Sequence, residues 1–332
     1  MHALVIAVLA LTPAASLPEP VETRIEAIAS GELAFWESGL EAWRFGDEEQ
    51  QALYEAFEAE TLARAQAYAA RVRADRNLPE DTDQIIGCQP AELIRLSAAR
   101  QFSGQGENAA DHAEARAEAM PLITQWHEAH ANLMDAPREA DTAWGYFINA
   151  AEQENDPVLR ELLIRAARDQ YARGLFGAFT NGQASPGARS LLMTANMHLV
   201  CTTDRDNTPW LATHVRAGRW FTITDHGSTA AQAAWVIAQH ADHDPEFQRQ
   251  ALTLIEPLAR EGDIRQSEFA LLFDRVLVNM GQPQIYGTRG SCVDGQWTAR
   301  PIQDEAGLDE RRAQMGLQPM EAYIARFANS CP

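Results

Sequence analysis

The chain contains no lysine, and all 27 of its basic residues are arginine. This absence excludes nucleotide binding through a P-loop lysine, Schiff-base chemistry with pyridoxal phosphate, and the Ser–Lys arrangement of penicillin-binding enzymes. A bias towards arginine is typical of a GC-rich genome. The missing lysine therefore excludes some chemistry without indicating any other.

Several short motifs are also missing. The four cysteines form no CxxC redox or zinc motif, and the chain has no GxSxG nucleophile motif. After Leu11, no stretch approaches the roughly 20 apolar residues that a membrane-spanning helix needs. No alternation of strands and helices appears, so a parallel sheet is not expected.

The chain has fewer basic than acidic residues, so its formal net charge is −20. A nucleic-acid backbone would be repelled by such a protein, and so would an anionic membrane surface. Hydrophobic residues make up 46% of the 332 residues, which is typical of a globular protein with a sizeable core.

The N-terminus has the pattern of a secretory leader. An unbroken apolar run from Ala3 to Leu11 is followed by the small residues Ala14, Ala15 and Ser16. The pattern predicts a signal peptide over residues 1–16 and a soluble, periplasmic or secreted mature protein. A short buried helix is the alternative interpretation.

Four cysteines in an exported chain suggest two disulfides, for which three connectivities exist. We expect Cys292 to pair with Cys331, because both lie in the C-terminal tail, and Cys88 to pair with Cys201. Free buried thiols are the alternative.

Helical periodicity dominates the chain and predicts an all-α fold, a two-part helical array with a small β-hairpin near the C-terminus. The hairpin is expected around the Asp294–Gly295 turn, and a second short strand over Trp220–Thr224. We place a soft boundary near Glu154, between a helical region over 17–154 and a second helical domain over 155–332. The expected helices cover 47–76, 108–134 with Pro121 inside, 157–178, 186–201, 208–217, 228–241, 245–260 and 264–280.

The segment from Gln239 to Gln248 holds the densest group of polar residues that could act in catalysis. His240 continues an apolar stripe at the end of a predicted helix, and Asp242 follows it. Asp244 precedes Pro245 and is expected to cap the next helix.

The predicted helix over 264–280 is apolar nearly all round, so Asp274 and Arg275 should be buried and paired. A structural ion pair is the common role for such residues, and participation in a site is the alternative. The following loop has glycines that permit unusual backbone angles, and its Gln284 and Tyr286 could line a pocket.

Simple structural roles are predicted for several further polar residues. Gln170 continues the apolar stripe of the helix over 157–178 and needs buried partners. Arg165, Asp169 and Arg173 are four apart and are expected to form an exposed ion-pair ladder. The segment from Asp204 begins like an EF-hand loop but lacks its glycine, so Asp206 or Asn207 is read as a helix cap.

One catalytic motif deserves comparison because the helical setting suits it. The HD phosphohydrolases use a histidine, a His–Asp pair and a later aspartate, an order that His226, His243–Asp244 and Asp274 reproduce. The gaps between these residues are short, and Asp244 is already expected to cap a helix, so the hypothesis of an HD phosphohydrolase motif is disfavoured.

Four strings in the second half of the chain are specific together: WVIAQHADHDPEFQ, DRVLVN, GQPQIYGT and PIQDEAGLDERRAQMGLQPMEAY. With these strings, roughly residues 155–325 resemble an uncharacterised bacterial family, a domain of unknown function. The resemblance implies that this region is one domain, and it assigns no catalytic residue. The chain departs from the usual pattern at Arg289, where glutamine is usual, and after His226–Gly227, where Trp-Pro is usual.

Two hypotheses follow for the function. The first is an exported hydrolase with a His/Asp acid–base or metal site, in which His240 is the base or metal ligand, Asp242 orients it and Arg275 neutralises negative charge. The second is a non-enzymatic helical module that binds a peptide, a protein or an envelope component. The pattern identifies no cofactor, metal, ligand or oligomeric state. The residues expected to line the site are Gln170, His226, Gln239, His240, Asp242, Gln248, Asp274, Arg275, Gln284 and Tyr286.

Overall fold

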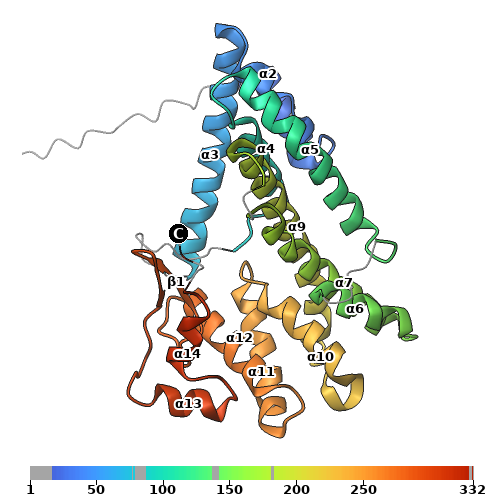
Figure 1. Ribbon diagram of the computed structural model, residues 1–332, viewed down its shortest axis with the longest axis vertical. Coiled ribbons are helices and arrows are strands. Elements are labelled where there is room, and N and C mark those ends of the chain that lie inside the picture. The colour runs from blue at the N-terminus through green and yellow to red at the C-terminus, as the bar shows by residue number, and fades with distance from the viewer. Residues whose placement is uncertain are drawn as a thin grey trace, which may run out of the picture.

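The computed structural model describes residues 17–76, 78, 87–136, 142–180, 183–328 and 331. Over these residues the chain is an array of α-helices with one two-stranded hairpin, so the predicted fold class is confirmed (Figure 1). The predicted signal peptide over 1–16 lies outside the described residues. Within the part of the chain that the structure describes, no helix is long and apolar enough to cross a membrane.

The first half of the array holds five α-helices and a short 3-10 helix. They are α1 (Glu19–Ser30), η1 (Phe35–Glu37), α2 (Leu40–Arg44), α3 (Glu48–Arg76), α4 (Ala91–Ser103) and α5 (Ala109–Ala131). The second half holds α6 (Ala143–Gln153), α7 (Pro157–Gly174), α8 (Phe176–Thr180), α9 (Pro186–Arg216), α10 (Ile223–Gln239), α11 (Pro245–Glu261), α12 (Gln266–Asn279), β1 (Gly290–Val293), β2 (Gln296–Ala299), α13 (Leu308–Gln314) and α14 (Met320–Ala325).

Three of the helices begin at a side-chain cap followed by proline, and one of these caps, Asp244, is the one expected from the sequence. Side-chain oxygens of Asp156, Ser185 and Asp244 accept backbone N–H groups in the first turns of α7, α9 and α11. In each case proline follows the cap, because its missing N–H is not needed there and its fixed φ suits the first turn.

Two local predictions are wrong. Trp220–Thr224 is not a strand; Thr222 instead caps α10, and Gly227 (φ 83°) breaks the helix once near its start. The expected helices over 186–201 and 208–217 are one helix, α9, which runs through Pro209. Asp206 and Asn207 are therefore helical residues and not caps.

The hairpin and the disulfides agree with the sequence. β1 pairs with β2 in antiparallel register, and Asp294 (φ 49°) and Gly295 (φ 73°) form the turn. Cys88 is bonded to Cys201 and Cys292 to Cys331, which confirms the expected pairing. The first bond ties the segment before α4 to α9, and the second ties the C-terminus to the hairpin.

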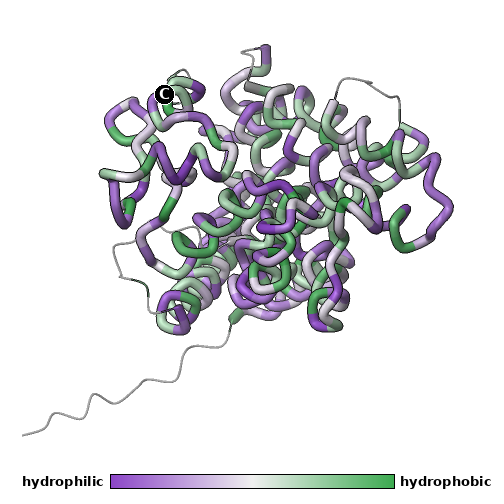
Figure 2. The backbone as a smooth tube through the Cα atoms, turned by 90° about the horizontal axis from the view of Figure 1, so that it is seen from below, coloured by the Kyte–Doolittle hydropathy of each residue, from purple (hydrophilic) through white to green (hydrophobic). Residues whose placement is uncertain are grey.

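The helices pack around two hydrophobic cores. One joins α1, α3, α4 and α5 with the start of α9, and the other joins α6, α7, the end of α9, α10, α11 and α12. Hydrophobic and hydrophilic residues alternate along the helical turns, as expected of helices that bury one face (Figure 2). Helix α9 belongs to both cores and links the two parts of the array.

Small residues bring α7 and α10 close together. Ala166 and Ala167 on α7, and Ala233, Ala234 and Ala238 on α10, are almost fully buried. Alanine lets helix backbones approach more closely than larger residues do, so polar side chains at the end of this contact can reach one another. This packing positions the candidate site.

Candidate functional site

A buried Asp–His pair lies where α7 meets the end of α10. The Nδ1 atom of His240 is 2.9 and 3.0 Å from the two carboxylate oxygens of Asp169. Asp169 is only 1% exposed, while the His240 side chain is 19% exposed. The carboxylate also accepts hydrogen bonds from Arg173 at 2.6 Å and Gln170 at 2.7 Å.

These contacts define the protonation of the imidazole. Burial lowers the pKa of His240 although Asp169 acts in the opposite direction, so the ring is neutral at pH 7. Burial disfavours the charge of Asp169, but His240 and Arg173 outweigh it and hold the pKa of that carboxyl below its usual value. The ionised Asp169 accepts the Nδ1–H of His240, which leaves Nε2 as a proton acceptor.

Arg173 extends the pair to a second carboxylate. Its Nη2 atom donates to both oxygens of Asp204 on α9, at 2.9 and 3.0 Å. Burial, together with the charges of Asp169 and Asp242, raises the pKa of Asp204 to about 8 against the attraction of Arg173. Asp204 therefore takes up a proton near neutral pH, a range in which ordinary aspartates stay ionised.

A third carboxylate, Asp242, lies beside this group. Its Oδ2 accepts from Nη1 of Arg275 at 2.5 Å, and its Oδ1 accepts from Nδ2 of Asn279 at 2.8 Å. Asn279 also donates to Gln248, which is fully buried and donates to the carbonyl of Ala238. Burial opposes the charge of Asp242, but Arg275 and Asn279 hold its pKa at about 2.

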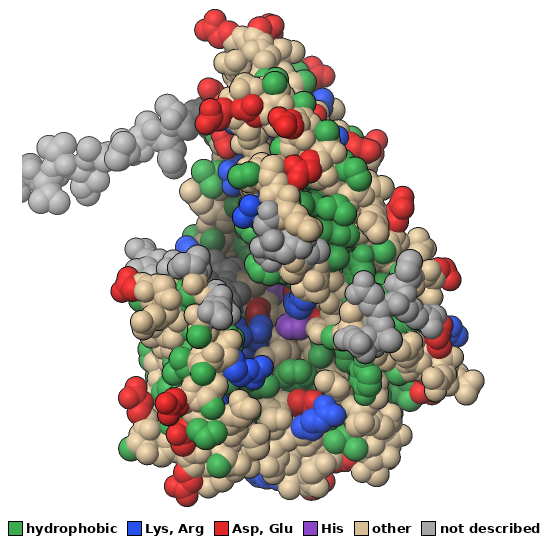
Figure 3. Space-filling model, in the orientation of Figure 1, with side chains coloured by type: hydrophobic (Ala, Val, Ile, Leu, Met, Phe, Trp, Pro, Cys, Tyr) green, Lys and Arg blue, Asp and Glu red, His purple; other side chains and the backbone are tan. Residues whose placement is uncertain are grey.

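These groups form one electrostatic network, which we call the polar centre: Asp169, Arg173, Asp204, His240, Asp242, Arg275 and Asn279. The charge of Arg275 lowers the pKa of His240, and the charge of Asp242 raises that of Asp204. Burial and Arg275 lower the pKa of the nearby Arg289 to about 10. The face of the molecule that Figure 3 presents has a hollow, with arginine, acidic and histidine side chains inside it.

The first half of the chain contacts the polar centre. Arg76 at the end of α3 donates to the carbonyls of Asp242 and His243, both at 3.2 Å. Arg205, next to Asp204, donates to the carbonyls of Cys88 and Gln89 and to the hydroxyl of Tyr68. The two halves of the array therefore meet at this point.

A cavity of about 690 Å³ borders two of the residues that hydrogen-bond to Asp169. Gln170 and Arg173 line it, together with the aromatic rings of Trp126, Trp144 and Tyr171. Its size suits a small molecule. These two partners of Asp169 thus also face a space that a ligand could occupy.

The structure brings some of the predicted site residues together. His240, Asp242 and Arg275 belong to the polar centre, and Gln170, Gln239 and Gln248 contact it or lie next to it. The predicted partner of His240 is corrected, since Asp169 holds the imidazole and Asp242 pairs with Arg275.

The remaining predicted residues lie elsewhere. Asp274 is fully buried and accepts hydrogen bonds from the backbone N–H groups of Ile285, Tyr286 and Thr288, so it shapes the loop after α12. Gln284 donates to the backbone carbonyl of Arg289 in the same loop and to that of Arg300, which follows β2. The side chain of Tyr286 faces another cavity, beside Phe273, and His226 borders a third.

Sequence reasoning missed four members of the polar centre. Asp169 was expected in an exposed ladder with Arg173, but Leu162, Ala166 and Asp169 are four and three residues apart and share a buried stripe. The comparison with an EF-hand loop did not indicate that Asp204 is buried, because Asp204 points inwards only if α9 is continuous. Nothing in the sequence sets Asn279 apart from other helix-end asparagines.

Among the described residues, no group of three His, Cys, Asp or Glu side chains is placed to hold a metal ion. The HD-like set is also not assembled, because Asp244 caps α11 and Asp274 binds the loop backbone. The imidazole, carboxylates and guanidinium groups of the polar centre are side chains that can act in acid–base and electrostatic catalysis.

Comparison with known families agrees with the resemblance noted in the sequence. A family of unknown function, DUF6624, matches residues 157–331, and the chain belongs to it. No curated protein and no solved structure shows a significant match to the chain. The matched residues include every member of the polar centre.

Proposed function

We propose that the polar centre is an acid–base site that hydrolyses a small anionic substrate. The observation that supports this proposal is the Asp169–His240 pair, in which a buried carboxylate holds Nδ1 and leaves Nε2 as a proton acceptor. In this role Nε2 removes a proton from the attacking water, and Asp169 stabilises the imidazolium that forms.

The surrounding cations support the substrate class. Arg173 and Arg275 are partly exposed, at 26% and 12%, and Arg289 lies nearby. Guanidinium groups in a site of low dielectric stabilise the negative charge that develops during ester, amide or phosphoester hydrolysis. Asp204, with its raised pKa, is suited to supply a proton to the leaving group.

Export of the protein remains part of this proposal. Two disulfides are typical of oxidising compartments, and the structure contains both. A periplasmic or secreted location would place the polar centre among extracellular or envelope-derived substrates.

The test is a hydrolysis screen of the full chain against the anionic p-nitrophenyl phosphate and bis(p-nitrophenyl) phosphate, with p-nitrophenyl acetate and a p-nitroanilide as neutral comparators. We expect turnover of at least one anionic compound, and a loss of about 100-fold or more in kcat for His240→Gln and for Asp169→Asn. Asp206→Asn is the matched control, because Asp206 is exposed and pairs with Arg165 outside the polar centre. The loss of activity on the acidic side should occur at a lower pH than for an ordinary imidazole, because burial lowers the pKa of His240.

A non-enzymatic binding module is the second candidate. It is favoured by the pairing within the polar centre, where each of the three carboxylates contacts an arginine, as in a structural ion-pair network. No turnover of any compound, together with a large loss of stability in His240→Gln, would favour this module. A folded His240→Gln variant with full activity would rule out the acid–base role.

A further inference from the structure

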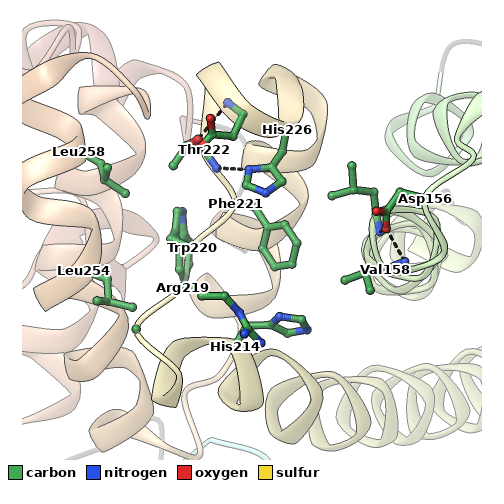
Figure 4. A pocket seen from close by; sticks show the side chains of 13 residues that line it. Asp156, Val158, His214, Arg219, Trp220, Phe221, Thr222, His226, Leu254 and Leu258 are labelled. Atoms are coloured by element: carbon green, nitrogen blue, oxygen red, sulfur yellow. Dashed lines mark hydrogen bonds between the residues drawn. The ribbon is translucent and has the colours of Figure 1, made fainter.

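A cavity of about 710 Å³ lies at the start of α7, whereas Asp169 and Arg173 of the polar centre lie near its end, and the proposed hydrolysis does not use it. It opens between the start of α7, the segment joining α9 to α10, and α11 (Figure 4). Its volume is within the range of small-molecule sites.

The walls of the cavity are mainly apolar. Leu254 and Leu258 from α11 lie on one side and Val158 from α7 lies on the other, with Trp220 and Phe221 between them (Figure 4). The Phe221 ring is fixed by neighbouring rings, since its centroid is 5.1 Å from that of His214 and 5.3 Å from that of His226. A rigid aromatic wall favours an aromatic or branched apolar group in the ligand.

Hydrogen-bond donors gather at the same wall. Nδ1 of His226 accepts the backbone N–H of Thr222 at 3.0 Å, so the neutral ring carries its proton on Nε2 and donates there. Arg219 is exposed and makes no ion pair with any residue that the structure describes. The indole N–H of Trp220 is buried and has no acceptor among these residues.

Two carboxylates, Asp156 and Asp225, line the cavity. Oδ1 of Asp156 is already used, because it accepts the N–H groups of Val158 and Leu159 at 2.7 and 3.1 Å. Asp156 lies across the cavity from Arg219 and Trp220 (Figure 4). Asp225 directly precedes His226, so an anionic group would sit at Arg219.

We propose that this cavity binds a small amphipathic carboxylate, with its aromatic or branched group against Trp220 and Phe221 and its carboxylate at Arg219. The cavity is a second binding site of the chain, independent of the acid–base site. The charged hydrogen bond from Arg219 supplies affinity for the acid over its neutral amide.

The test is calorimetric titration of the full chain at pH 7.5 with 3-phenylpropanoate, 3-phenylpropanamide and 3-phenylpropylamine. We expect one saturable site for the acid, at least tenfold weaker binding of the amide, and no saturable binding of the amine. Tryptophan fluorescence should change with the same midpoint, because Trp220 lines the cavity.

Variants locate the binding site. Arg219→Gln should weaken binding of the acid about tenfold and leave binding of the amide unchanged. Arg216→Gln is the matched control, because Arg216 is an exposed residue in the last turn of α9 that does not line the cavity. The proposal fails if no compound binds saturably up to 1 mM. Equal affinity for acid and amide, preference for the amine, or indifference to Arg219→Gln would also overturn it.

Discussion

Asp169 shows how far the role of a residue depends on its surroundings. Its spacing from Arg165 and Arg173 is that of a solvent-exposed ladder, worth a few tenths of a kcal/mol. In the folded chain the same carboxylate is buried and bonded to His240, Arg173 and Gln170. The expected pair of Arg173 with Asp169 is present, but the pair is buried and not solvent-exposed.

Asp274 illustrates the opposite case, a residue expected in the site that is structural. It is fully buried, and three backbone N–H groups and the hydroxyl of Thr288 donate to it. Asp274→Ala would leave these donors unpaired, so we expect the free energy of unfolding to fall by roughly 3 kcal/mol or more.

Urea unfolding followed by circular dichroism measures this loss. Asp135→Ala is the control, because Asp135 is an exposed aspartate for which no such change is expected. A drop of less than about 1 kcal/mol in Asp274→Ala would mean that the loop does not depend on this carboxylate.

At the scale of elements, the continuity of α9 decides the site. A break before Thr208, as the sequence suggests, would leave Asp204 and Asn207 in a loop. The continuous helix buries both, and Asn207 donates to the carbonyl of Arg165 on α7. Pro209 is tolerated because neighbouring helices hold α9 in both cores, so packing outweighs the missing N–H.

The segment before α4 is the other element that shapes the polar centre. Gly87 has a φ of 77°, and a Cβ placed on it would lie 2.3 Å from the backbone nitrogen of His243. Gly87→Ala should therefore push this segment away from the 242–243 backbone. We expect a loss of roughly 2 kcal/mol beyond the cost of the positive φ itself, measured by thermal or urea unfolding.

Gly262→Ala is the matched control for that measurement. Gly262 has the same φ of 77°, but a Cβ there would meet no atom within 4 Å. It therefore measures only the backbone strain, about 1 kcal/mol. Equal losses in the two variants would show that the close approach to His243 is not important.

At the scale of the whole molecule, buried histidines should make stability depend on pH. Burial lowers the pKa of His127 and His130 to about 4, and that of His198 and His243 to about 3. The unfolded chain binds protons near pH 6.5, before the folded chain does, so each histidine removes stability as the pH falls below 6.5. Asp204 acts in the opposite direction between pH 8 and 4, because its folded pKa is raised.

The histidines outnumber this one aspartate. Between pH 7.5 and 5.5 each of the four histidines lowers the free energy of unfolding by about 1.3 kcal/mol, and Asp204 raises it by about 2.5 kcal/mol. These five groups together therefore lower the free energy of unfolding by roughly 3 kcal/mol. Urea unfolding at the two pH values measures it, and His198→Leu should reduce the loss by about 1.3 kcal/mol. A free energy of unfolding that is constant or rises towards pH 5.5 would contradict the prediction.

Much of the fold follows from local sequence. Helix starts at Asp156, Ser185 and Asp244, and the Asp294–Gly295 turn, depend on residues a few positions apart, so their patterns predict them. The disulfide pairing and the family also follow from the sequence, the first from the positions of four cysteines and the second from strings spread over residues 155–325.

The polar centre was decided only by the tertiary structure. The contact of Asp169 with His240 spans 71 residues, that of Asp242 with Arg275 spans 33, and that of Arg173 with Asp204 spans 31. No local pattern relates such positions, because the partner of a buried charge depends on which helix faces pack together. The sequence determined that these side chains lie on helices, and the packing of α7, α9, α10 and α12 determined which of them meet.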